Sequence, residues 1–367
     1  MPDIRPALQQ AWLTKGLIAC VLWPVSLIYG AIVSLRKLLY RFGVFHTQQL
    51  PVPVIVVGNV FVGGVGKTPL VIALVKQLTA RGLKVGVLSR GYGSSGEGSQ
   101  SVTPQSSAIE VGDEPVLIAR SCQVPVCVGK NRFQAGLDLL AQNPHIQVIV
   151  CDDGMQHWSL ANDLALCVFD ERGLGNCWLL PAGPLRESWP LDRSGYSHVI
   201  TLSTSNFELQ NPQRVNEQEQ ELVQEKKQEQ PQELEQPKAD FIVPRVLADF
   251  ALQADGTTQS LSNFRGQKVR ALAGIGKPQA FFDMLTAQGI ALSATQALAD
   301  HDDMRSIQSD PEMGEVLCTE KDAVKLWNYQ PTAWAVPLVT EIPQELLDLI
   351  LVRIGPKLSS THGHQIT

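Results

Sequence analysis

The feature that most constrains this chain is an apolar run that leads into a glycine-rich turn and then an amphipathic segment, PVPVIVVGNVFVGGVGKTPLVIALVKQLTAR, over residues 51–81. Residues 54–57 are continuously apolar and rich in β-branched side chains, which predicts a strand buried in a parallel sheet. Leu70, Leu74 and Leu78 recur on one stripe, which predicts a helix with one buried face. A strand, a tight turn and a helix in this order indicate an α/β fold.

The turn has the residues of a phosphate-binding loop. Its three glycines let the backbone fold so that successive N–H groups point at one anion, while Lys67 adds a positive charge and Thr68 a hydroxyl. The pattern G-x-x-x-x-G-K-[ST] is not fully met, because Phe61 stands where its first glycine falls. A glycine-rich packing turn is the alternative, but it does not explain Lys67 and Thr68 together. The predicted nucleotide-binding residues are Phe61, Val62, Gly63, Gly64, Val65, Gly66, Lys67 and Thr68.

Composition narrows the classes of function. The 367 residues allow two domains, each with its own core. A net charge of -6 argues against nucleic-acid binding, which favours basic stripes with interleaved aromatic residues. The seven cysteines form no C-x-x-C pair, so we expect neither structural zinc nor a disulfide framework, and a reducing cytoplasm fits best.

An uncharged segment near the start predicts contact with a membrane. Residues 16–35 carry no charged side chain and are just long enough to cross a bilayer as a helix, which takes about 20 apolar residues. A helix lying in the membrane interface is the alternative. Because Arg36, Lys37 and Arg41 follow the segment, the positive-inside bias places the rest of the chain in the cytoplasm.

Polar side chains follow the next predicted strands, at the edge where open α/β sheets bind ligands. Residues 84–88 form one such strand, with Arg90 and Tyr92 after it, and residues 124–128 form another, with Arg132 after it. These side chains are candidates for contacts with phosphate or sugar. A plain turn explains the first pair equally well.

A strand that ends in two carboxylates is the second strong signal. Residues 148–150 form a buried strand, and Asp152 and Asp153 stand at its carboxyl end. Carboxylates placed there fix Mg²⁺ beside the hydroxyl of a phosphate loop, here Thr68. Gln156 lies close enough in sequence to line the same cleft. Ordinary solvated carboxylates are the alternative.

Another acidic pair opens a predicted helix at GDEPVLIAR. Asp113 and Glu114 lie in its first turn, where the helix dipole favours negative charge. Asp113 as a simple N-cap is one interpretation. The other is that the pair orients Mg²⁺ or accepts a proton from an attacking hydroxyl. The stretch before this helix, residues 94–107, is expected to be a polar loop.

The composition changes abruptly after two more predicted strands, residues 164–169 and 198–202, which flank a long loop containing Arg186. Such a loop above a sheet edge suits recognition of an acceptor, and irregular packing explains it as well. Residues 208–236 are rich in Gln and Glu and cannot form a core of their own. We interpret them as a solvated linker or insertion, with a frayed charged helix as the alternative.

The remaining segment carries weaker signals. A strand at 269–273 is followed by glycines and Lys277, but Pro278 stands where a phosphate loop needs Ser or Thr, so a strand-to-helix turn is expected. His301 lies among three aspartates that can tune its basicity, and a solvated acidic loop is the alternative. The string TEKDAVKL is not N-K-x-D and gives no reason to prefer guanine.

Taken in order, the phosphate loop, SRGYG, GDEP, CDDGMQH, LLPAGPLRE, ADHD and TEKDAVK resemble the tetraacyldisaccharide 4'-kinases, the lipid A 4'-kinases of Gram-negative bacteria. That family's loop also lacks the first glycine, so Phe61 agrees with it, whereas the Gln/Glu-rich stretch departs from it. The resemblance implies ATP-dependent, Mg²⁺-assisted phosphorylation of an acylated disaccharide phosphate in the membrane. It also implies action at the cytoplasmic face of the bacterial inner membrane, without an obligate protein partner.

The resemblance further implies roles for single residues. Lys67 would hold the β- and γ-phosphates, and Asp113 would accept the proton of the sugar hydroxyl with His301 as its dyad partner. The candidates for the metal site are Thr68, Asp152, Asp153, Glu114 and Gln156, and those for the acceptor are Arg90, Tyr92, Arg132 and Arg186.

The expected fold is a P-loop-type α/β core with a mostly parallel sheet flanked by helices, at residues 46–205. A membrane-associated helical segment at 1–45 precedes it, and an insertion at 206–240 separates it from a smaller α/β part at 241–367. A membrane-associated P-loop ATPase switch that acts through a protein partner is the alternative function. Such switches often place a lysine just before the paired glycines, where this chain has Val62.

Overall fold

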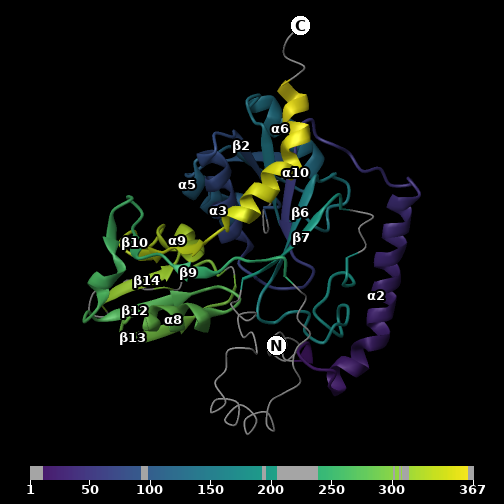
Figure 1. Cartoon of the computed structure of the whole chain (residues 1–367). Helices are drawn as coiled ribbons and strands as arrows, with labels where there is room; N and C mark the ends of the chain where they lie inside the picture. Colours follow the sequence, from purple (N-terminus) through teal and green to yellow (C-terminus); the bar gives the residue numbers. More distant parts are fainter. Residues whose placement is uncertain are drawn as a thin grey trace, which may run out of the picture.

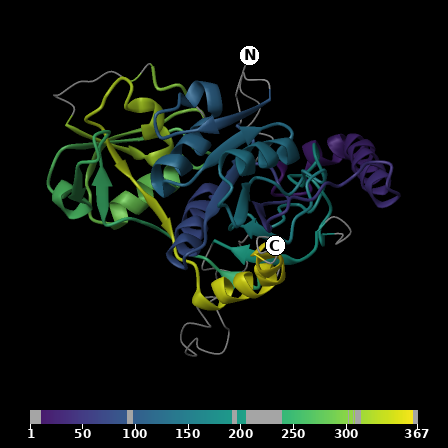
Figure 2. The same ribbon diagram turned by 90° about the horizontal axis from the view of Figure 1, so that it is seen from above.

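The computed structural model describes residues 11–91, 98–191, 196–204, 239–300, 302–305, 307 and 314–362. The whole of the Gln/Glu-rich stretch at 208–236 lies outside these ranges, as do Tyr92 and His301. The described residues form a large central sheet, with the apolar N-terminal helix on one side and a second, smaller sheet on the opposite side (Figures 1 and 2). The predicted mixed α/β fold is confirmed.

The central sheet has eight strands in the order β3-β4-β2-β5-β1-β6-β7-β8, and only the β3–β4 pair is antiparallel. Every residue of β1, β2, β4, β5 and β6 is buried, because helices cover both faces and the sequences are apolar throughout. The strands are β1 (Val54–Gly58), β2 (Val85–Ser89), β3 (Ser99–Val102), β4 (Val126–Gly129), β5 (Val148–Asp152), β6 (Leu164–Phe169), β7 (Val199–Ser203) and β8 (Phe241–Ile242).

Strand β3 corrects one expectation, since Ser99–Val102 falls within the stretch predicted to be a polar loop. It is an edge strand that pairs with β4, and only Val102 among its four side chains is buried. An edge strand with one solvated face needs little apolar surface, so the polar composition concealed it. The Ser101 hydroxyl donates to Gln142 Oε1 over 2.7 Å, which ties this edge to the neighbouring helix α6 (Arg132–Gln142).

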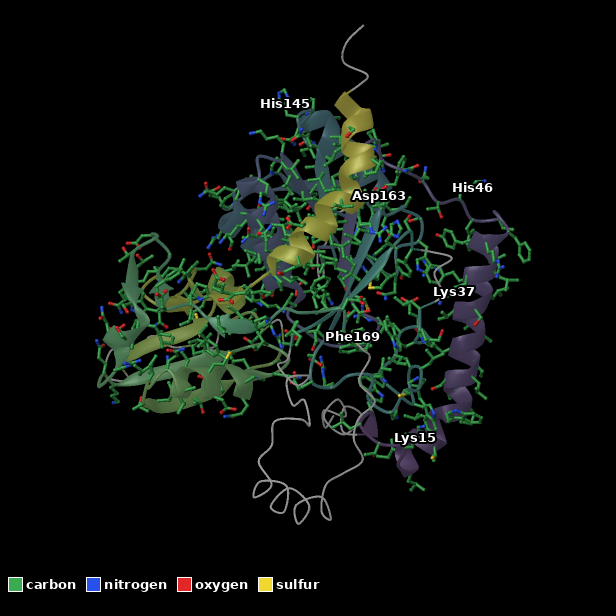
Figure 3. The ribbon with its side chains drawn as sticks, viewed as in Figure 1. Lys15, Lys37, His46, His145, Asp163 and Phe169 are labelled. Atoms are coloured by element: carbon green, nitrogen blue, oxygen red, sulfur yellow. The ribbon has the colours of Figure 1, made fainter. Side chains whose placement is uncertain are left out.

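Helices α3 (Lys67–Ala80), α4 (Ala108–Val111), α5 (Asp113–Cys122) and α6 flank the central sheet. Leu70, Leu74 and Leu78 of α3 are fully buried, which confirms the predicted apolar stripe. The last helix, α10 (Gln344–His362), also packs on this sheet, although it follows the smaller one in sequence (Figure 1). Its Lys357 Nζ lies 3.0 Å from Asp163 Oδ2, just before β6 (Figure 3).

The smaller sheet has six strands in the order β11-β10-β15-β14-β12-β13, with parallel pairing from β15 to β13. A two-stranded ribbon of β9 and β16 lies beside it. The strands are β9 (Arg245–Leu247), β10 (Phe250–Leu252), β11 (Thr258–Ser260), β12 (Val269–Ala273), β13 (Leu292–Ala297), β14 (Glu315–Thr319), β15 (Trp334–Val336) and β16 (Leu338–Thr340). The helices are η4 (Leu261–Phe264), α8 (Pro278–Ala287) and α9 (Glu320–Leu326).

Helix α2 (Leu17–Arg41) is long and apolar enough to cross a membrane by length and composition, and little of its most apolar stretch is buried. One face is fastened to the loop after β6: the Ser26 hydroxyl donates to the Leu179 carbonyl, and the Tyr29 hydroxyl to the Arg186 carbonyl, each over 2.9 Å. The other face leaves large apolar side chains in solvent. They include Leu17, Val21, Ile28, Ile32 and Leu35.

Candidate active site

The glycine-rich turn between β1 and α3 has the geometry of an anion cradle. Gly63 and Gly66 adopt φ values of 110° and 73°, in the left-handed region that side chains disfavour. Helix α3 begins at Lys67 directly after the turn, so its free N–H groups and its dipole face the same place. Phe61 is buried and pairs with Leu185, which anchors the start of the loop to the core.

Lys67 connects this loop to the carboxyl end of β5. Its Nζ lies 3.0 Å from Asp153 Oδ1 and 3.1 Å from Asn59 Oδ1. Burial raises the pKa of Asp153, but the charges of Lys67 and Arg186 outweigh it and hold this pKa below its ordinary value. Asp153 also has a φ of 48°, an uncommon conformation for a residue with a side chain. Lys67 and Asp153, which the sequence assigned to the nucleotide and to the metal, therefore lie beside each other.

Asp152 is buried at 1% exposure, and none of the described residues hydrogen-bonds to its Oδ1. Burial, and then the charge of Glu114, raise the pKa of Asp152 to about 7. The negative charges of Asp152 and Glu114 repel each other, and Asp152 Oδ1 is buried without a hydrogen bond from the described residues. A bound cation would reduce this repulsion and would give the oxygen a partner. The described residues hold no cluster of three or more Asp, Glu, His or Cys side chains, so a metal here would keep several waters, as Mg²⁺ commonly does.

Arg132 connects the carboxyl ends of β4 and β5. It is buried at 1% exposure, and its guanidinium donates to the carbonyls of Gly129 and Asp152 over 3.2 and 3.3 Å. Burial lowers its pKa. This placement argues against direct contact between Arg132 and an acceptor. Arg90, by contrast, is exposed just after β2.

Asp113 and Glu114 meet two lysines of α9 from the TEKDAVKL string. Asp113 Oδ2 lies 3.2 Å from Lys325 Nζ, and both side chains are largely buried. Lys321 Nζ lies 3.6 Å from Glu114 and 3.0 Å from Asp300. Burial lowers the pKa of Lys321, but the charges of the surrounding carboxylates have the larger effect and raise this pKa above its ordinary value. The acidic pair therefore lies against the part of the chain that contains Asp300, the residue before His301.

Gln156 is engaged by groups other than a metal. Its Nε2 donates to Asn59 O and Glu187 Oε1, each over 3.0 Å, and its Oε1 accepts from Arg186 over 3.3 Å. Because the amide oxygen already has a cationic donor, this geometry argues against Gln156 as a metal ligand. Arg186 also reaches Asp153, so it joins the acidic edge to the loop that holds α2.

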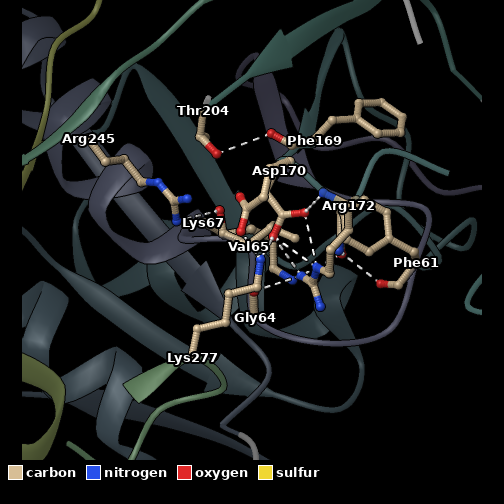
Figure 4. A network of polar contacts seen from close by, with 12 residues as sticks. Phe61, Gly64, Val65, Lys67, Phe169, Asp170, Arg172, Thr204, Arg245 and Lys277 are labelled. Carbon is tan, nitrogen blue, oxygen red and sulfur yellow. Dashed lines mark hydrogen bonds and ion pairs between the residues drawn. The ribbon is translucent and has the colours of Figure 1, made fainter. Parts of the chain in front are cut away.

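A third polar network surrounds the carboxyl end of β6 (Figure 4). Asp170 is buried at 1% exposure and pairs with Arg172 over 2.8 Å and with Lys277 over 3.0 Å. Burial raises the pKa of Asp170, but the two cations outweigh it and hold this pKa low. Lys277 stands at the predicted strand-to-helix turn, which is confirmed, since α8 begins at the next residue.

A cavity of about 330 Å³ lies between the phosphate loop and the smaller sheet. Gly64, Lys67 and Thr68 line one side, and Lys277 and Lys321 line the other. Apolar side chains complete the wall: Leu117, Leu247, Ile275, Phe281, Met284 and Leu338. The cavity therefore combines an anion cradle, cations and an apolar surface, the combination that a nucleotide needs.

Sequence reasoning missed several residues of this site. Asp170 and Arg172 follow a predicted strand, so the sheet-edge rule applied to them as it did to Asp152. Arg245 and Glu187 had no such signal. Their roles depend on contacts with Val65 and Lys37, which lie far away in sequence.

Comparison with known proteins gives a consistent result. The family model described as "Tetraacyldisaccharide-1-P 4'-kinase" matches residues 18–355. The tetraacyldisaccharide 4'-kinase of Acidovorax sp. (strain JS42) is 44% identical over 356 residues, which are 97% of this chain and 96% of that protein. The enzyme of the same name from Polaromonas naphthalenivorans is 45% identical over 375 residues, covering 99% of this chain and 100% of that protein.

A solved structure agrees with these relatives. The "apo" form of LpxK from Aquifex aeolicus in complex with ATP superposes with a TM-score of 0.73 at 27% identity, covering 92% of this chain and 100% of that one. The apolar helix α2 and the family together indicate association with a membrane. On the match over residues 18–355 and the identity of its relatives, this chain belongs to the tetraacyldisaccharide 4'-kinase family.

Proposed function

We propose that the chain is an ATP-dependent kinase that phosphorylates the 4'-hydroxyl of tetraacyldisaccharide 1-phosphate in lipid A biosynthesis, giving the 4'-phosphorylated lipid A precursor. The observation that carries the proposal is the contact of Lys67 with Asp153, which joins the anion cradle to the acidic end of β5 within a chain of this family. Phosphoryl transfer needs mainly positioning and charge stabilisation, and this edge supplies groups for both.

In this proposal the triphosphate lies in the cradle formed by residues 61–68. Lys67 exchanges its contact with Asp153 for the β- and γ-phosphate oxygens. The Asn59 amide, 3.1 Å from Nζ, keeps the side chain pointing into the cradle. The apolar wall of the neighbouring cavity suits the base of the nucleotide.

Mg²⁺ fits the acidic edge, because Asp152 has a buried oxygen without a partner among the described residues. Asp152 and the Thr68 hydroxyl would hold the ion, with Glu114 and Asp153 acting through bound waters. When bound, the ion would neutralise charge that develops on the transferred phosphoryl group.

Asp113 is the proposed proton acceptor for the attacking hydroxyl, with His301 as its dyad partner. The support from the described residues is the burial of Asp113 beside Glu114 and the approach of Asp300 to the same cluster. Asp113→Ala and His301→Ala should each reduce turnover by about 100-fold or more while ATP binding persists. Near-normal turnover in either variant would remove that residue from the mechanism.

The lipid acceptor is proposed to approach along α2, at the cytoplasmic face of the inner membrane. Arg186 is a candidate acceptor contact that lies against this helix, since the Tyr29 hydroxyl donates to its carbonyl. Arg90 and Tyr92 remain candidates, whereas Arg132 supports the strand ends. Acceptor and nucleotide would thus reach the β5 edge from opposite sides.

Helix α2 is proposed to lie in the membrane interface instead of crossing the bilayer. Ser26, Tyr29 and Arg36 all hydrogen-bond to backbone carbonyls in the loops after β5 and β6, so lipid cannot surround the helix on every side. Lys15 lies at one end of the helix, where it can meet lipid headgroups (Figure 3). Brominated lipids should quench Trp23 most strongly when bromine is near the headgroups. Strongest quenching at the bilayer centre would favour a spanning helix, and Trp23→Phe gives the background.

The chain is proposed to divide functionally into a kinase core at 46–205 and a C-terminal lobe at 241–367, joined by the insertion. Strand β8 and helix α10 of the second part nevertheless pack on the central sheet, so the two parts share one structural framework. Replacing residues 206–238 with a Gly/Ser linker should leave turnover unchanged. A loss of turnover in folded protein would assign a role to the insertion.

The test of the function is transfer of labelled phosphate from ATP to tetraacyldisaccharide 1-phosphate in mixed micelles by the full chain. Lys67→Met should lower the rate by at least about 100-fold. Lys84→Met is the matched control, because Lys84 is exposed before β2, outside the site. Hydrolysis of ATP without label in lipid, stimulated only by a protein, would favour the ATPase switch.

A further inference from the structure

Two arginines contact the phosphate loop through its carbonyl oxygens (Figure 4). Arg172, which follows β6, donates from Nη2 to Gly64 O over 2.9 Å. Arg245, which opens β9, donates from Nη1 to Val65 O over 3.1 Å. Arg172 precedes the long insertion in sequence and Arg245 follows it, yet they hydrogen-bond to two successive peptide groups of the loop.

These contacts fix the direction of the loop's N–H groups. In a trans peptide the carbonyl of one residue and the N–H of the next point in opposite directions. Holding Gly64 O therefore orients the N–H of Val65 away from Arg172, and holding Val65 O orients the N–H of Gly66 away from Arg245. Both N–H groups belong to the turn that forms the anion cradle.

The glycines of the loop also make room for the arginines. A Cβ atom on Gly63 would lie 2.9 Å from Arg172 Nη1, and one on Gly66 would overlap the Arg245 guanidinium. Gly63 and Gly66 thus serve two needs, a left-handed backbone and the close approach of a cation. Gly64, between them, meets nothing within 4 Å.

The guanidinium of Arg172 is itself held in place. Arg172 pairs with the buried Asp170 through Nε and Nη2 at 3.0 and 2.8 Å, and its guanidinium carbon lies 5.1 Å from the Phe61 ring centre. Arg245 is largely shielded from water, and burial lowers its pKa. The carboxylate of Asp170 and the ring of Phe61 therefore leave the Arg172 guanidinium little freedom to move away from the loop.

We propose that Arg172 and Arg245 are positioning residues that hold the phosphate loop in its anion-binding form before nucleotide arrives. The inference rests on the proposed binding of ATP at this loop. A loop that is already ordered loses less conformational freedom on binding, so the two arginines strengthen nucleotide affinity by ordering the loop.

Calorimetric titration of the full chain with ADP and with ATP tests this. Arg172→Gln and Arg245→Gln should each weaken both nucleotides by about tenfold, equivalent to about 1.4 kcal/mol. The loss should be equal for ADP and ATP, because the cradle as a whole is affected. Arg245→Lys keeps one donor for Val65 O and should recover part of the affinity. The KM for the lipid should not change in any of these variants.

Arg265→Gln is the matched control, since Arg265 Nε donates to the carbonyl of Gln288 in the C-terminal lobe, away from the loop. Unchanged affinity for both nucleotides in the two Gln variants would overturn the proposal. So would a loss confined to ATP, which would make the arginines direct contacts of the γ-phosphate. If the unmodified chain bound neither nucleotide, the proposed function itself would fail, which separates the two outcomes.

Discussion

The ion pair between Asp113 and Lys325 gives the most quantitative prediction. Asp113 Oδ2 and Lys325 Nζ lie 3.2 Å apart, and the two side chains are 5% and 10% exposed. At an effective dielectric constant of about 20, two unit charges at this separation attract each other by about 5 kcal/mol. Lys325→Met keeps the length of the side chain but leaves the carboxylate buried without this partner.

Removing one partner of a buried pair commonly destabilises a protein by about 3–5 kcal/mol. We expect the lower end, about 3 kcal/mol, because Asp113 keeps its hydrogen bond from the Glu114 N–H over 2.9 Å and the charge of Lys321 stays nearby. The double variant Asp113→Asn with Lys325→Met should be more stable than the sum of the two single losses predicts.

Urea unfolding of the full chain in detergent measures these free energies. Arg81→Met is the matched control, because Arg81 and Asp348 also form an ion pair, at 3.6 Å, but with side chains 38% and 57% exposed. Exposed pairs contribute about 0–1 kcal/mol. If Lys325→Met destabilised the chain no more than Arg81→Met does, water would screen the Asp113 pair and the reasoning from burial would be refuted.

Three further predictions concern single side chains around the site. Burial, and then the charges of Arg132 and Arg90, lower the pKa of His157 from 6.5 to about 4. As pH falls, the unfolded chain binds a proton at this histidine before the folded chain does, so the free energy of unfolding decreases between about pH 6.5 and 4. His157→Gln should reduce this dependence of the unfolding free energy on pH, as measured by urea unfolding at several pH values. Tyr29→Phe removes the hydrogen bond to Arg186 O and should raise the KM for lipid about fivefold with the KM for ATP unchanged. Asp170→Asn removes the anchor of Arg172 and should weaken ADP and ATP by about tenfold; unchanged binding would show that the anchor is unnecessary.

The parts of the fold that sequence predicted well are those with local causes. The strand, loop and helix over residues 54–80 depend on β-branched residues, on glycines that accept left-handed φ values, and on a leucine stripe, all visible within one window. Asp152 and Asp153 follow from the rule that parallel strands bind ligands at their carboxyl ends. The same rule applied to Asp170 after β6, but no second feature in the local sequence marked it.

The sequence could not decide features that depend on side-chain direction or on distant contacts. Arg132 and Arg90 both follow a strand, yet one lies under the sheet edge and the other in solvent. Gln156 is near Asp153 in sequence, but its amide is taken by Arg186 and Glu187. Strand β3 was missed because pairing with β4, not an apolar pattern, defines it. Such information exists only once the chain has folded.

Three contacts around the site join the two halves of the chain and share one chemical pattern, whereas the exposed Arg81–Asp348 pair has the opposite direction. Lys277, Lys325 and Arg245, all after the insertion, pair with Asp170, Asp113 and the carbonyl of Val65, all before it. In every case the later segment supplies the cation and the nucleotide-binding edge supplies the acceptor. A bound triphosphate adds negative charge at the nucleotide-binding edge, and this charge attracts the same cations of the later segment more strongly. Nucleotide binding should consequently tighten the contact between the two halves, which couples occupation of the loop to closure of the site around it.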